Sequence, residues 1–146
     1  MSDLGGSYLN LFLFSVGGVH FGIDAEQACG MTPYAGEEAE DLFWFHKELG
    51  FGSRPVTYVT PTVITIRMPD ARSYRVIIDS LEDIAEFSRH DIRLFPQLLE
   101  PVALRNGMWG IVVKDDRMIL LVDFERLLRE RMDVTAHGEV PKHEDI

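Results

Sequence analysis

The sequence predicts a mainly β protein with short helices, built from two β-barrel subdomains of which the first is incomplete. Three observations support this class. Segments rich in β-branched and aromatic residues come in pairs joined by turn residues, helical periodicity is confined to short stretches, and both halves of the chain contain a hairpin that ends in an Ile-Asp step.

Three hairpins are expected from these strand pairs. Gly17-Gly18 joins the first pair, because glycine adopts positive φ at little cost. Residues 69–72 join the second pair, and residues 114–117 join the third. The expected strands are 8–16, 19–23, 57–68, 73–78, 109–113 and 118–122.

Helical signals are fewer and shorter. The longest candidate covers Glu37 to Leu49 and is followed by Gly50, a residue typical of helix C-termini. Asp24, Asp79 and Asp123 each precede a short helical pattern, so we interpret them as N-caps rather than catalytic carboxylates. A closing helix is expected over about 123–131, followed by a polar tail over 132–146.

The repeat also indicates where the first subdomain is abridged. In the second half, 44 positions separate Asp79 from Asp123, whereas in the first half 17 separate Asp24 from Asp41. One hairpin of about 27 residues is therefore missing before the helix expected at 37–49. We expect a first subdomain made of strands over about 8–34 with that helix, and a second subdomain over about 57–122.

Composition excludes several function classes. The 146 residues are 46% hydrophobic and 26% charged, which is ordinary for a single soluble domain. With 14 basic and 24 acidic residues the formal charge is −10, which opposes binding to nucleic acid and to anionic membranes. No targeting signal and no run of about 20 apolar residues is apparent, so we expect a cytoplasmic protein without membrane insertion.

No constellation of residues indicates catalysis, a metal site or a cofactor. The five histidines lack the spacing of paired ligands on a helix, and no phosphate-binding loop or nucleophile elbow is present. The single cysteine, Cys29, has no basic neighbour in sequence to activate it, so a small buried apolar role is favoured. We expect no enzyme activity.

The most unusual feature is a run of four large apolar residues, Leu42-Phe43-Trp44-Phe45. On a helix these residues would cover most of the circumference, so one or two would face solvent. Two interpretations remain open: the run fills the space left by the missing hairpin, or part of it contacts a partner protein.

The order and spacing of these segments resemble the CheW-like family, the coupling proteins of bacterial chemotaxis. Residues 12–24 are similar to the family's opening hairpin, residues 74–84 to its second characteristic stretch, and residues 110–128 to its closing hairpin and helix. The strand pair that carries an Asn-Leu-Arg-Gly motif in the family is absent between Tyr34 and Asp41.

The resemblance implies one domain over residues 8–131, made of two five-stranded SH3-like barrels and without catalysis. It further implies a scaffold in a two-component chemosensory array, with a chemoreceptor tip and the regulatory domain of a CheA-like histidine kinase as partners. The residues we expect at the partner surface are Ala28, Cys29, Met31, Leu42, Phe43, Trp44 and Phe45. The alternative is a self-associating module, in which a second copy completes the abridged barrel in trans.

Overall fold

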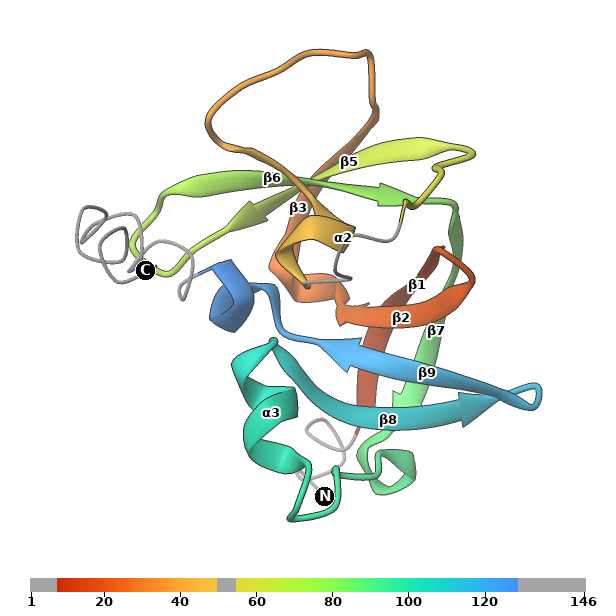
Figure 1. Cartoon of the computed structure of the whole chain (residues 1–146). Helices are drawn as coiled ribbons and strands as arrows, with labels where there is room; N and C mark the ends of the chain where they lie inside the picture. Colours follow the sequence, from red (N-terminus) through yellow and green to blue (C-terminus); the bar gives the residue numbers. More distant parts are fainter. Residues whose placement is uncertain (1–7, 50–54, 129–146) are drawn as a thin grey trace.

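The computed structural model describes residues 8–49 and 55–128, and within them nine strands form two sheets (Figure 1). The larger sheet has the order β7-β1-β2-β9-β8 and the smaller has the order β3-β5-β6-β4. The mainly β class is therefore confirmed. The strands are β1 (Tyr8–Val16), β2 (Val19–Asp24), β3 (Ala28–Pro33), β4 (Leu42–Trp44), β5 (Pro61–Arg67), β6 (Ser73–Asp79), β7 (Leu81–Ser88), β8 (Met108–Lys114) and β9 (Arg117–Val122).

Helical segments are short and lie between the strands. The two α-helices with labels in Figure 1 are α2 (Phe45–Glu48) and α3 (Glu100–Arg105), and residues 124–128 are also helical. Two 3₁₀ turns, η1 (Ala25–Gln27) and η2 (Arg89–Asp91), complete the set. No helix in the described part of the chain is long and apolar enough to cross a membrane.

All three predicted hairpins are present as antiparallel pairs. They are β1–β2, β5–β6 and β8–β9. Gly17 and Gly18 both have positive φ, at 61° and 84°, as a tight two-residue turn requires. Asp115 and Asp116 form the β8–β9 turn with φ of 54° and 65°, a conformation that Asp tolerates better than most residues.

The sheets do not follow the predicted division along the chain. The N-terminal hairpin belongs to the larger sheet, because β2 pairs in parallel with β9 near the C-terminus. The smaller, four-stranded sheet is made from the middle of the chain, residues 28–79. The assignment of residues 8–34 to an incomplete first subdomain and of 57–122 to a second was therefore wrong, since a local repeat does not reveal pairing between distant strands.

Two helix predictions were also wrong. Residues 37–41 are not helical and Leu42–Trp44 is a strand, so the predicted helix over 37–49 is reduced to the single turn α2. The residues after Asp79 form β7 rather than a helix. In both places, pairing with a distant strand outweighs the local helical pattern: β4 pairs with β6, and β7 pairs with β1.

The three predicted capping aspartates have different roles. Asp24 accepts a hydrogen bond from the Glu26 backbone N–H at η1, and Asp123 accepts from the N–H groups of Glu125 and Arg126. These two N-caps are confirmed. Asp79 is buried and instead accepts from the N–H groups of residues 59 and 60, so it fixes the turn before β5. The parts of the closing helix and tail beyond residue 128 lie outside the described residues.

The principal core lies between the two sheets, which form an upper and a lower layer in Figure 1 with α2 between them. Four fully buried phenylalanines come together here, from β1, β2, α2 and the 124–128 helix: Phe14, Phe21, Phe45 and Phe124. A second core lies against the other face of the larger sheet, around Leu11, Leu13 and Leu121.

Candidate partner-binding surface

The first three predicted partner residues lie on β3, at one edge of the smaller sheet. Within the described chain β3 pairs only with β5, and the register shifts at Cys29. Cys29 is exposed, so the prediction of a buried apolar role was wrong. Ala28 and Met31 are half-buried and pack against the core between the sheets. This edge therefore presents one exposed thiol and two partly covered apolar side chains.

The other four predicted residues lie on β4 and α2, at the opposite edge of the same sheet. Leu42, Phe43 and Trp44 are half-buried and pair in parallel with β6. Phe45 is fully buried, with its ring 5.1 Å from that of Phe14 and 4.8 Å from that of Phe21. The prediction that Phe45 contacts a partner was wrong, because this side chain has no surface to offer and forms part of the core.

Trp44 links the two edges of the smaller sheet. Its ring lies 5.3 Å from that of Tyr34, which directly follows β3, and 5.0 Å from that of Tyr58. The rings meet nearly edge to face, a favourable arrangement for aromatic pairs. Side chains therefore join the two edges where the sequence predicts a gap, which favours the interpretation that the apolar run fills this space.

A polar contact supports the same cluster. His46 Nδ1 lies 2.9 Å from the Tyr58 hydroxyl, and the backbone N–H of His46 donates to that hydroxyl at 3.3 Å. Burial raises the pKa of Tyr58 to about 12. Burial also lowers the pKa of His46, with a smaller contribution from Lys47. Both shifts favour the neutral form of these side chains.

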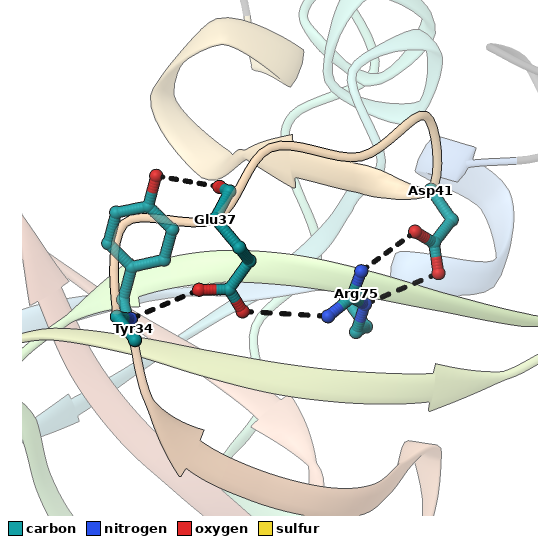
Figure 2. Close-up of polar contacts among 5 residues, drawn as sticks. Tyr34, Glu37, Asp41 and Arg75 are labelled. Atoms are coloured by element: carbon teal, nitrogen blue, oxygen red, sulfur yellow. Dashed lines mark hydrogen bonds and ion pairs between the residues drawn. The ribbon is translucent and has the colours of Figure 1, made fainter.

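An ion-pair cluster around Arg75 of β6 holds the segment where the sequence predicts a missing hairpin (Figure 2). Arg75 donates to both carboxylate oxygens of Asp41, at 3.0 and 3.3 Å, and lies 3.6 Å from the Glu37 carboxylate. The hydrogen bond from Arg75 lowers the pKa of Asp41.

Backbone contacts reinforce this cluster. The Arg75 N–H donates to the Asp41 carbonyl at 2.8 Å, and the Tyr34 hydroxyl donates to the Glu37 carbonyl at 3.0 Å. Glu37 and Asp41 are thus held to Arg75 of β6, and Tyr34 is held to Glu37 (Figure 2). The segment predicted to be abridged is therefore ordered by hydrogen bonds and ion pairs.

The most exposed apolar group lies elsewhere, on the segment before α3 and on its first turn. It consists of Leu94, Leu98, Leu99 and Val102, whose exposed fractions run from 48% to 88%. We call these four residues the α3 patch. Sequence reasoning missed it, because residues 94–102 show neither helical nor strand periodicity; the adjacent pair Leu98-Leu99 beside two prolines was the available signal.

The α3 patch is flanked by positive charge in an acidic protein. Arg93 precedes it and Arg105 ends α3, and both are exposed. Ala103 of α3 is buried, and contacts between α3 and β8 hold the helix beside the larger sheet. The α3 patch therefore consists of exposed apolar residues that are close in sequence, on and before a helix that contacts the larger sheet. In the described residues no three His, Cys, Asp or Glu side chains gather as a metal site would require.

Similarity to known proteins is found in structure but not in sequence. No protein-family model matches the sequence, and no curated protein matches it at a significant level. Among solved structures, the chain is similar to the scaffolding protein TtCheW from Thermoanaerobacter tengcongensis, with a TM-score of 0.62 and 15% sequence identity. The match covers 82% of this chain and 86% of TtCheW. At this identity the likeness shows that the two proteins share a fold.

Proposed function

We propose that this chain is a non-catalytic cytoplasmic adaptor in a bacterial chemotaxis-type array, where it couples a chemoreceptor tip to a CheA-like histidine kinase. The observation that carries the proposal is the shared fold with a scaffolding protein over most of both chains. The sequence resemblance to the CheW-like family supports it independently, because it rests on the order of motifs rather than on coordinates.

The exposed surfaces agree with a binding role. Soluble monomers seldom leave neighbouring large aliphatic side chains uncovered without a use for them. The α3 patch has four such side chains within nine residues, and Leu98 is the most exposed of them, at 88%. We assign this patch to the regulatory domain of the kinase, and the β3 edge around Ala28, Cys29 and Met31 to the receptor tip.

Binding measurements with purified partners test the proposal. The full chain is titrated against the kinase regulatory domain and the receptor tip encoded nearest to its gene. Leu98→Glu should weaken kinase binding by at least tenfold, since burying a leucine contributes about 1.5–3 kcal/mol. Val59→Glu is the matched control, because Val59 is 81% exposed and lies outside the α3 patch. The affinity of this variant for the kinase domain should stay within about twofold of the wild-type value.

The same design separates the two surfaces. Cys29→Arg should weaken binding of the receptor tip and leave kinase binding unchanged. Failure of both partners to bind at high-micromolar concentration contradicts the adaptor role. Equal effects of Leu98→Glu and Val59→Glu contradict the assignment of the α3 patch.

Self-association through the β3 edge is the second candidate, and one observation favours it. Charged side chains commonly protect edge strands from pairing with other chains. The edge strand β7 carries Glu82, Asp83 and Glu86, whereas β3 carries no charged residue. Light scattering at two concentrations a hundredfold apart tests this candidate: a constant monomer mass contradicts it, and a dimer that Cys29→Arg abolishes supports it.

A further inference from the structure

A cavity of about 200 Å³ lies on the larger sheet beside the β8–β9 turn. All five strands of that sheet contribute residues to its lining. Its apolar lining comes from Leu13 of β1 and Ile119 of β9, both of which are buried. The rest of the lining is polar and charged. The cavity lies apart from the α3 patch and the β3 edge, so what it binds does not depend on the proposed function.

One side of the cavity is acidic because of an irregularity in β7. The register of β1 against β7 shifts between Leu13, opposite Asp83, and Phe14, opposite Leu81. Glu82 is therefore an extra residue, and both Glu82 and Asp83 line the cavity. In a regular strand, the side chains of adjacent residues point to opposite faces of the sheet. A bulge interrupts this alternation, which allows Glu82 and Asp83 to line the same cavity.

The opposite side is basic because of the β8–β9 turn. Lys114 and Arg117 are directly opposite each other in the register, and both line the cavity together with the turn residue Asp115, so this side has two positive charges and one negative charge. Like charges at such paired positions oppose strand pairing. The β8–β9 hairpin thus holds Lys114 and Arg117 side by side, although the repulsion between them destabilises the pairing of its two strands.

The existing ion pairs stay within each side. Glu82 Oε1 is within hydrogen-bond distance of His20 Nδ1, at 3.3 Å, and Lys114 forms an ion pair with the turn residue Asp115 at the same distance. In the described part of the chain, no hydrogen bond or ion pair joins the two sides. The cavity therefore separates an acidic wall from a basic wall over an apolar base.

We propose that this cavity binds a small zwitterion of the size of a free amino acid. Its ammonium group would lie against Glu82 and Asp83, and its carboxylate against Lys114 and Arg117. The volume sets the size: at about 30 Å³ per water, the space corresponds to roughly seven waters, or to a ligand of about seven to nine non-hydrogen atoms. Leu13 and Ile119 would contact its aliphatic side chain.

An NMR titration of the ¹⁵N-labelled full chain tests the proposal, with L-serine, L-threonine, L-valine and L-leucine as probes. At least one should give saturable shifts of the backbone amides of residues 82–84 and 113–117. N-acetylvaline and valine amide each keep only one of the two charges, and each should bind at least tenfold more weakly than valine. Absence of saturable shifts up to about 50 mM for all four amino acids overturns the proposal, and so does binding of either derivative as tight as that of valine.

Charge-neutralising variants locate the site. Asp83→Asn and Arg117→Gln should each weaken binding of the best probe by about tenfold or more. Glu38→Gln and Arg67→Gln likewise remove one negative and one positive charge at exposed positions that do not line the cavity, and they should leave the affinity unchanged. Binding that all four variants retain equally overturns the assignment. Thermal unfolding of each variant, without ligand, shows whether a loss of binding comes from a loss of fold.

Discussion

Replacing Phe45 by alanine tests whether the apolar run serves the core or a partner. The ring is fully buried and packs within 5.7 Å of three other phenylalanine rings, those of Phe14, Phe21 and Phe124. Truncating a buried phenylalanine to alanine removes its transfer free energy and leaves a cavity, which together cost about 3–5 kcal/mol. For a domain of this size, roughly 4 °C per kcal/mol places the expected fall in Tm at about 12–20 °C.

Urea unfolding followed by tryptophan fluorescence measures this loss, with Trp44 as a reporter directly beside the site. The midpoint should fall while the slope m stays constant. Phe45→Leu leaves a smaller cavity and should lose about 1–2 kcal/mol, so the trend remains measurable if the alanine variant does not fold. Val59→Ala, at an exposed position, should change the free energy of unfolding by less than about 0.5 kcal/mol.

One result would refute this reasoning. If Phe45→Ala unfolds within about 1 kcal/mol of the wild type but binds a partner protein more weakly, the ring is part of an interface and the described packing is incorrect.

Two further predictions concern buried and paired carboxylates. Asp79→Asn should lower the free energy of unfolding by about 1.5–3 kcal/mol, because two backbone N–H groups lose a charged acceptor; a loss under about 0.5 kcal/mol in urea unfolding counts against this role. Asp41, paired with Arg75, has a lowered pKa, so its contribution is complete above the ordinary value of 3.8 and is lost as the pH falls below it. Stability should therefore decline less steeply below about pH 4 in Asp41→Asn than in the wild type, and parallel curves would show that the ion pair does not contribute.

Local signals predicted the parts of the fold that depend on local structure. Gly17-Gly18 determines the first hairpin because the turn needs positive φ at both positions, and the pairing of its flanking strands follows. Asp24 and Asp123 were recognised as caps because a cap needs only a side-chain oxygen next to the first turn.

The remaining features depend on partners that are distant in sequence. Leu42–Trp44 became a strand because β6, about 30 residues away, offered a parallel partner and Arg75 fixed the preceding segment. Asp79 has the sequence context of a cap, yet its carboxylate contacts residues 59 and 60 across the sheet. The exposure of Leu98 could not be predicted either, because sequence alone does not show which apolar residues remain exposed to solvent.

The parallel pairing of β2 with β9 also constrains how the protein is made. His20 lies opposite Ile119, so its partner strand is synthesised 99 residues later. At about 5–20 residues per second, a ribosome needs roughly 5–20 s to supply that strand. During this time the N-terminal hairpin has emerged, but its free edge and apolar face have no cover. The middle sheet, whose four strands lie within residues 28–79, can form first. The four strands of the smaller sheet are therefore all synthesised before β9, whereas the N-terminal hairpin waits longest for the strand that pairs with it.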